Sequence, residues 1–121
     1  MRKWLVLALL VSAPSGAFAF CDEWTTPNTI LEASFQVLVY LDWQQTLAAS
    51  KKPGFTETNP LLGKHPSQET INTLIPLGML AHVGISCWFE HPLREWWQGI
   101  SVVIEGAVVD HNSRLQIKWG F

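Results

Sequence analysis

The chain has 121 residues, which is enough for one domain and no more. Hydrophobic residues make up 48% of the chain and charged residues only 15%, well below the usual quarter. The net charge of −2 at pH 7 gives no electrostatic basis for binding nucleic acid. The composition therefore excludes a basic nucleic-acid-binding domain and leaves two classes, a membrane protein or a small exported helical domain.

The first nineteen residues have the pattern of a secretory signal peptide. Arg2 and Lys3 precede an apolar run over 4–11, and the small-x-small triplet 17–19 follows. This order of charge, apolar core and small residues predicts cleavage after Ala19, with an uncleaved anchor as the alternative. The mature chain, 20–121, would then form a single helical domain with its N-terminus outside the cytoplasm. Lipidation of Cys21 is not expected, because a bulky Phe precedes it.

The first predicted helix covers about 30–49. Thr29 and Glu32 fit a capping box, which places the helix start near Ile30. A helix of this length can span a bilayer. Four of its polar side chains lie within one face, and they are Glu32, Gln36, Asp42 and Thr46. This polar face suits a helix in a membrane bundle, and it equally suits an amphipathic helix in a soluble domain.

Two further helices are predicted, over about 69–89 and 95–111. The stretch 74–89 contains no Asp, Glu, Lys or Arg, and its Gly78, His82 and Ser86 share one face. The third helix carries a second polar stripe, formed by Gln98, Ser101, Glu105 and Asn112. The tail over 113–121 reads as a short strand or an interfacial arm. We therefore expect an all-α fold, in which a cleaved signal peptide is followed by a three-helix transmembrane bundle.

Basic residues favour one orientation of these three spans. With the mature N-terminus in the periplasm, the connection over 50–72 and the tail lie inside the cell. These inner segments hold five basic residues, Lys51, Lys52, Lys64, Arg114 and Lys118, whereas the outer segments hold only Arg94. The asymmetry agrees with the positive-inside rule for an inner-membrane protein.

The same topology brings the two cysteines of the chain to the outer face. Cys21 lies just after the signal peptide, and Cys87 lies near the outer end of the second helix. Two cysteines on the oxidising side of a membrane suggest one disulfide. The alternative is a free Cys21 and a Cys87 that packs as a small apolar side chain.

Candidate chemistry lies near the inner end of the predicted spans. Asp42 and Glu105 should lie at a similar depth, and Glu57 and Asn59 on the connection could close over them. Two carboxyl groups at one depth could share a proton, bind a hard cation or pair with His82. The alternative is that these polar side chains only hold helices together. The sequence shows no metal-binding or cofactor-binding motif.

One resemblance rests on two segments of the chain. Asp42 to Thr46 reads D-x-x-x-T, and 57–66 reads E-x-N-P-L-L-G-x-H-P. This arrangement is similar to that of a family of small membrane proteins encoded by proteobacterial phages and prophages. The stretch 104–109 and Asn112 of the third helix also resemble that family. The resemblance implies a location in the host envelope and a phage origin, and it implies no activity.

The sequence therefore predicts a small polytopic inner-membrane protein that is not an enzyme. It would act on the host envelope by contact, in lysis or in the exclusion of a second phage. Its expected partners are the lipid bilayer and host envelope proteins, with self-association left open. One alternative is a membrane-embedded enzyme or a proton-handling or ion-handling protein that uses Asp42 and Glu105. Another is a soluble periplasmic helical domain.

Overall fold

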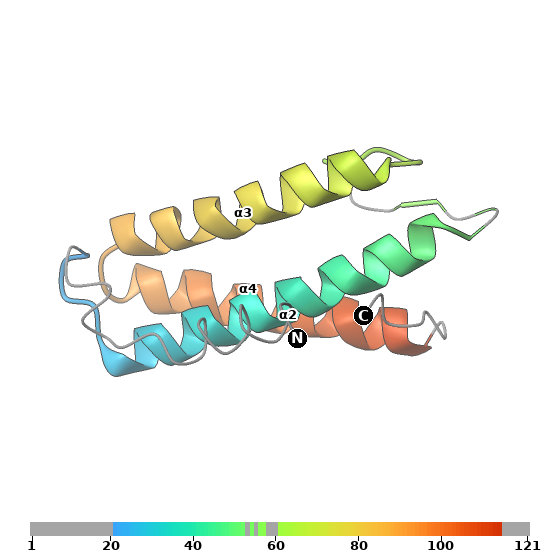
Figure 1. Cartoon of the computed structure of the whole chain (residues 1–121). Coiled ribbons are helices and arrows are strands. Elements are labelled where there is room, and N and C mark those ends of the chain that lie inside the picture. The colour runs from blue at the N-terminus through green and yellow to red at the C-terminus, as the bar shows by residue number, and fades with distance from the viewer. Residues whose placement is uncertain (1–20, 53, 55, 58–60, 115–121) are drawn as a thin grey trace, which may run out of the picture.

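The computed structural model describes residues 21–52, 54, 56–57 and 61–114. These residues form three helices and no strand (Figure 1). The helices are α2 (Thr26–Ser50), α3 (Gln68–Trp88) and α4 (Leu93–Arg114). The predicted all-α fold is confirmed for this part of the chain. The predicted signal peptide and residues 115–121 of the tail lie outside the described residues.

Helix α2 begins four residues earlier than the sequence predicts, so the capping box expected at Thr29 is wrong. The helix is capped by Thr25, whose hydroxyl accepts a hydrogen bond from the backbone N–H of Asn28. The Asn28 side chain in turn accepts from the Thr25 backbone N–H, at 2.9 Å. An amide oxygen can replace the usual Glu or Gln in this reciprocal pattern. Pro27 suits the first turn because the backbone N–H that proline lacks would have no intrahelical partner there.

The other two helices lie close to their predicted ranges. Ser67 caps α3, and its hydroxyl accepts a hydrogen bond from the backbone N–H of Thr70 at 3.1 Å. Helix α4 is longer than expected at both ends. It starts directly after Pro92 and continues to Arg114. An ion pair between Asp110 and Arg114, at 2.9 Å, supports its last turn.

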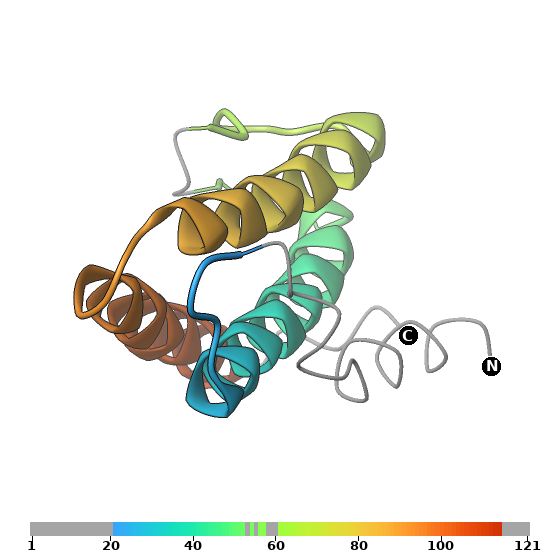
Figure 2. The ribbon, with the colours of Figure 1, turned by 90° about the vertical axis from the view of Figure 1, so that its left-hand side faces the viewer.

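Helix α2 is the element against which the other two helices pack. It contacts α4 along much of its length and α3 to a smaller extent, whereas α3 and α4 contact each other little. Viewed from the end, the three helices lie at the corners of a triangle (Figure 2). Gly106 of α4 faces α2, because an added Cβ there would lie 3.8 Å from Leu38 Cδ1.

The distribution of polar and apolar side chains is the reverse of that in a soluble domain. The described side chains that are buried are mostly polar, among them Asn28, Glu32, Gln36, Gln45, His82, Ser86, Arg94 and Gln98. Large apolar side chains are exposed instead, among them Leu77, Leu80, Ile100, Val103 and Ile104. Soluble proteins bury such apolar residues and almost never bury charged ones fully. The interior of these three helices is therefore held by hydrogen bonds more than by apolar packing.

One of the described helices, α3, is long and apolar enough to cross a membrane, with a mean hydropathy of 1.3. Core helices of soluble proteins can reach such values, but they are mostly buried. In α3, only 17% of the apolar window is buried. Three spans, as the sequence predicts, are therefore not established by hydropathy, because α2 and α4 carry many polar side chains.

Candidate functional site

Two groups of polar side chains lie between the helices. The disulfide-end cluster comprises Asn28, Glu32, Gln36, His82, Ser86, Arg94 and Gln98. The loop-end cluster comprises Asp42, Gln45, Glu105, Asn112 and Ser113. Leu38 and Gly106 meet between the two clusters along the α2–α4 interface.

Glu32 is the centre of the disulfide-end cluster. Its Oε1 accepts hydrogen bonds from Gln36 Nε2 at 3.1 Å and His82 Nδ1 at 2.8 Å. Its Oε2 accepts from Ser86 Oγ at 2.9 Å and from Gln98 Nε2 at 3.2 Å. The donors come from all three helices, so one carboxylate links α2 to both α3 and α4. A carboxylate with four donors is well matched to a buried position.

The His82 ring is fixed in position by stacking as well as by Glu32. It lies between Phe35 and Trp97, with ring centroids at 3.6 Å and 4.8 Å. Its Nδ1 donates to Glu32, while its buried Nε2 has no hydrogen-bond partner among the described residues. Such an oriented imidazole has the form of a metal ligand or a general base. Among the described residues, however, no group of three metal-binding side chains surrounds it.

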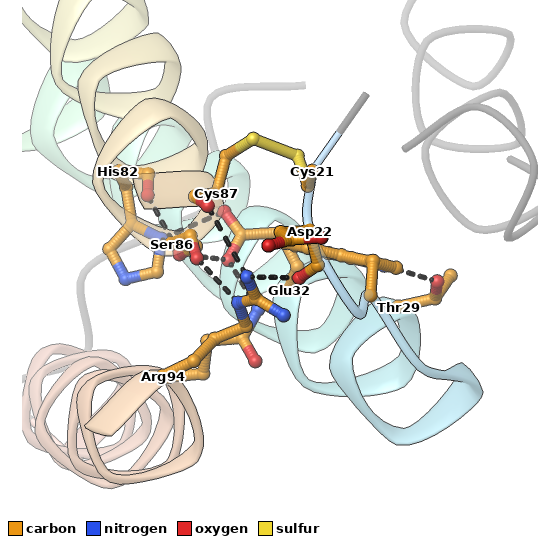
Figure 3. The surroundings of a disulfide bond; sticks show 10 residues. Cys21, Asp22, Thr29, Glu32, His82, Ser86, Cys87 and Arg94 are labelled. Atoms are coloured by element: carbon orange, nitrogen blue, oxygen red, sulfur yellow. Dashed lines mark hydrogen bonds and ion pairs between the residues drawn. A yellow bond between two sulfur atoms is a disulfide. The ribbon is translucent and has the colours of Figure 1, made fainter. Parts of the chain in front are cut away.

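Arg94 is fully buried, and it donates hydrogen bonds to backbone carbonyls (Figure 3). Its Nε donates to the Ser86 carbonyl at 2.7 Å, and its Nη2 donates to the carbonyls of Asp22 at 2.8 Å and Cys87 at 3.3 Å. The guanidinium also lies 5.3 Å from the centre of the Trp24 ring. A cation at this place satisfies the last carbonyls of α3 and interacts favourably with the negative end of the α3 helix dipole.

The predicted disulfide candidates are joined in the structure. Cys21 and Cys87 form a disulfide that connects positions 66 residues apart (Figure 3). The bond attaches the segment before α2, residues 21–25, to the end of α3. Arg94 bonds the Asp22 and Cys87 carbonyls beside it, so the same two segments are connected twice.

A third connection to the segment 21–25 comes from the turn between α3 and α4. His91 Nε2 donates to the Glu23 carbonyl at 2.7 Å, and His91 Nδ1 pairs with Glu95. The Glu23 carbonyl, and after it the Glu95 carboxylate, raise the pKa of His91 above its ordinary value. Glu95 also accepts a hydrogen bond from Asn28 Nδ2 at 3.0 Å, which links this turn to the start of α2.

In the loop-end cluster, Asp42 and Glu105 lie close enough across the α2–α4 interface for their carboxyl groups to act on each other. Two carboxyl groups can form a hydrogen bond with each other only when one of them carries a proton. Asn112 Nδ2 donates to Asp42 at 3.0 Å and to Gln45 Oε1 at 3.1 Å. The arrangement has the geometry of a shared-proton pair between α2 and α4.

The other predicted site residues are placed differently. Glu57 lies near enough to Asp42 to act on it electrostatically, whereas Asn59 lies outside the described residues. His82 pairs with Glu32, so the option of its pairing with Asp42 or Glu105 is wrong. The reason is position along α3, because His82 lies closer to the disulfide end of that helix than to the loop end.

Glu57 has one backbone contact with the segment before α3. The Glu57 N–H donates to the Lys64 carbonyl at 2.8 Å, and Leu62 between them is buried. Gly63 has a φ of +81°, in the left-handed region that glycine adopts at no steric cost. These features bring Glu57 back toward the end of α2.

Sequence reasoning missed the disulfide-end cluster as a unit. Each helix contributes polar residues spaced by four positions, and they are Asn28, Glu32 and Gln36, then His82 and Ser86, then Arg94 and Gln98. Residues at this spacing share a helix face. The repeated spacing was the available signal, and it indicates that the three faces meet.

Comparison with known proteins gives no match to a protein family, to a curated protein or to a solved structure.

Proposed function

We propose that the chain is a small integral membrane protein whose three helices cross the bacterial inner membrane, with residues 21–25 on the periplasmic side. The observation that carries this proposal is the reversed distribution of side chains, polar inside and apolar outside. Leu80 is 71% exposed and Val103 is 72% exposed, whereas Glu32 and Gln45 are buried. Lipid is a suitable environment for such exposed side chains, and polar residues in membrane helices face the protein interior.

The helix lengths fit a bilayer. At 1.5 Å per residue, the 25, 21 and 22 residues of α2, α3 and α4 correspond to roughly 38, 32 and 33 Å. The hydrocarbon core of a bilayer is about 30 Å thick. The polar residues of α2 and α4 lower the hydropathy of those helices, but they lie on the faces that meet the other helices.

The ends of the helices carry opposite charges. Lys51, Lys52, Lys64 and Arg114 are exposed at the loop end, and Asp22, Glu23 and Glu90 are exposed at the disulfide end. Trp88 and Trp96 are also exposed at the disulfide end, as expected of aromatic side chains at a membrane interface. The positive-inside rule then supports a cytoplasmic loop end and a periplasmic disulfide end.

We further propose that the protein acts by contact with components of the host envelope. The phage-family resemblance supports this part of the proposal, and so does the use made of the buried polar groups. Glu32 and Arg94 are occupied in joining the helices and the segment 21–25. Polar side chains that hold membrane helices together need no substrate to explain them.

The test is membrane topology combined with carbonate extraction. Reporter fusions after positions 55, 92 and 121 should report inside, outside and inside, and the chain should stay in the membrane fraction. An aqueous chain with all three reporters outside the cytoplasm would refute the proposal. It would favour the alternative of a soluble periplasmic helical domain.

A second candidate function, proton handling, is favoured by the contact between Asp42 and Glu105. The two carboxyl groups lie close enough between α2 and α4 to hold one proton between them, and Glu57 acts on Asp42 electrostatically. Proteoliposomes that contain a pH-sensitive dye would measure this activity. Asp42→Asn and Glu105→Gln should lower proton flux, whereas Glu69→Gln, at an exposed carboxylate of α3, should not. Equal flux in all three variants would leave the pair with a purely structural role.

A further inference from the structure

A groove runs along the exposed side of α4, beginning at the turn between α3 and α4. It is an open hollow of about 770 Å³, lined by residues of α4 and of the turn before it. His91 and Glu95 lie at its mouth, and Val103 and Ile104 lie at its far end. The stretch from His91 to Ile104 covers roughly 20 Å along the helix axis.

The wall of the groove is apolar and open to the surroundings. Trp96 and Ile100 contribute to the lining and are both exposed. At Gly99 an added Cβ would meet nothing within 4 Å, so the floor is uncovered at that position. Among the described residues, the lining comes from α4 and the turn before it alone, and α3 contacts α4 little. Under the proposed membrane location, this apolar wall faces lipid.

The mouth of the groove lies at the acidic end of the protein. Asp22, Glu23 and Glu90 are exposed there, and Glu95 is half-exposed. The described basic side chains at this end are Arg94 and His91, and the four carboxylates outnumber them. A surface of this charge attracts cationic groups and repels anionic ones.

We propose that this groove holds one acyl chain of an amine-bearing phospholipid from the periplasmic leaflet, with the ammonium group against the acidic mouth. The proposal rests on the membrane location proposed above. One leaflet contributes about 15 Å to the hydrocarbon core, which the groove is long enough to accommodate. Trp96 at the rim has the position of an interfacial aromatic side chain.

A second copy of the chain is the competing occupant. Two copies that meet through this side of α4 about an axis along the membrane normal would place their acidic ends next to each other. Asp22, Glu23 and Glu90 of each copy would then face like charges, which opposes association. A zwitterionic phospholipid, which can turn its ammonium group toward the acidic end, has no net charge to be repelled.

The test is the phospholipid that the full chain retains. The protein would be purified in mild detergent from vesicles with equal amounts of phosphatidylethanolamine and phosphatidylglycerol, and bound lipid would be counted by native mass spectrometry. Val103→Trp fills the groove with an apolar side chain. Leu80→Trp adds the same side chain to the exposed face of α3, outside the groove, and serves as the matched control.

We expect the wild type and Leu80→Trp to retain phosphatidylethanolamine in preference to phosphatidylglycerol. Val103→Trp should retain about tenfold less phosphatidylethanolamine. This is the loss expected when roughly two methylene groups of the acyl chain no longer fit in the groove. The double variant Glu23→Gln/Glu90→Gln should reduce the headgroup preference without abolishing retention, because it changes the mouth and leaves the apolar wall intact.

Three results would overturn the proposal: equal lipid retention by Val103→Trp and Leu80→Trp, a preference for phosphatidylglycerol, or crosslinking of two chains through Val103→Cys. Carbonate extraction of the same variants separates this inference from the proposed function. A chain that stays in the membrane but retains no lipid contradicts the groove alone. A chain in the aqueous fraction contradicts both.

Discussion

At the scale of single residues, the structure places a carboxylate and a guanidinium where both are costly unless their hydrogen-bonding capacity is used. Glu32 accepts four hydrogen bonds, and Arg94 donates three to backbone carbonyls. Removing one partner from such a buried arrangement leaves the others without compensation. Their main role in the structure is to fix the positions of the three helices.

Replacing Glu32 by Ala should destabilise the protein by about 3 kcal/mol, because buried donors on all three helices lose their acceptor. Glu69→Ala, at an exposed carboxylate of α3, should change stability by less than about 1 kcal/mol. The measurement is reversible unfolding in mixed micelles that contain increasing amounts of denaturing detergent. Similar midpoints for the two variants would contradict the role given to Glu32.

Replacing Arg94 by Met should cost about 3 kcal/mol, since it removes charge-assisted hydrogen bonds from a fully buried group. Amide exchange should rise in 21–23 and at the end of α3, where its acceptors lie. Arg114→Met is the matched control, because Arg114 is exposed and its ion pair with Asp110 contributes less than about 1 kcal/mol. Unchanged exchange at both segments would refute this account of Arg94.

At the scale of the helices, α2 and α4 form the close pair and α3 is the more separate element. The close pair is possible at Gly106 because its missing side chain leaves room for Leu38. α3 is joined to α2 mainly near its disulfide end, where His82 and Ser86 hydrogen-bond Glu32. Near its other end, the Trp43 ring N–H donates to the Asn72 side chain. The two interfaces should therefore respond differently to added bulk.

Gly106→Phe should separate α2 from α4 and destabilise the protein by about 1–3 kcal/mol, the usual cost of overpacking. Gly106→Ala should be tolerated, because its Cβ would lie at an ordinary contact distance of 3.8 Å from Leu38. Gly78→Phe is the control on α3, where a new Cβ would meet nothing within 4 Å. Thermal unfolding in detergent would compare the three variants, and an equal loss for both Phe variants would contradict the close approach at Gly106.

The contact between 21–25 and the α3–α4 turn should weaken as the pH rises. The raised pKa of His91 means that the protonated ring is favoured in the folded state, by the Glu23 carbonyl and by Glu95, with Arg94 acting in the opposite direction. The contribution is complete below the ordinary pKa of about 6.5 and is lost as the pH rises through the raised value. Amide exchange of 21–25, corrected for its intrinsic pH dependence, should therefore increase over this range. In His91→Gln it should show no such transition.

At the scale of the whole molecule, the three helices and their order follow from sequence patterns that have clear physical causes. The uncharged stretch 74–89 and the breakers Pro53 and Pro92 locate the segments. The start of α2 could not be predicted as reliably, because Thr25 and Thr29 both offer capping hydroxyls. The choice of Thr25 depends on a second hydrogen bond, in which the Thr25 backbone N–H donates to the Asn28 side-chain oxygen.

The candidate site was only partly predictable for a similar reason. Asp42 and Glu105 lie at matching depths on their helices, and this position along the sequence anticipates their contact. The partner of His82 depends on how α3 is placed against α2, which helix periodicity does not specify. A long-range choice of this kind is made by packing and by the disulfide, not by local sequence.

The disulfide is the covalent link on which the whole arrangement should depend most. Replacing Cys21 by Ser should lower the stability by about 2–4 kcal/mol, as expected for a bond that closes a loop between positions 66 apart. The thermal midpoint with and without reductant would measure this effect. Reductant should lower the midpoint of the wild type to that of Cys21→Ser and should leave the variant unchanged. A wild type that is insensitive to reductant would contradict the prediction.

The position of Glu32 has a consequence for how the protein is made. Its acceptor oxygens lie on the first of the three helices, yet three of their four donors lie on helices that are synthesised later. Until α3 and α4 are present, α2 carries an uncompensated carboxylate, and a nascent helix of this kind is poorly retained in lipid. In a membrane location, biosynthetic insertion would therefore be cooperative, with α2 held at the translocation machinery until the rest of the chain has emerged.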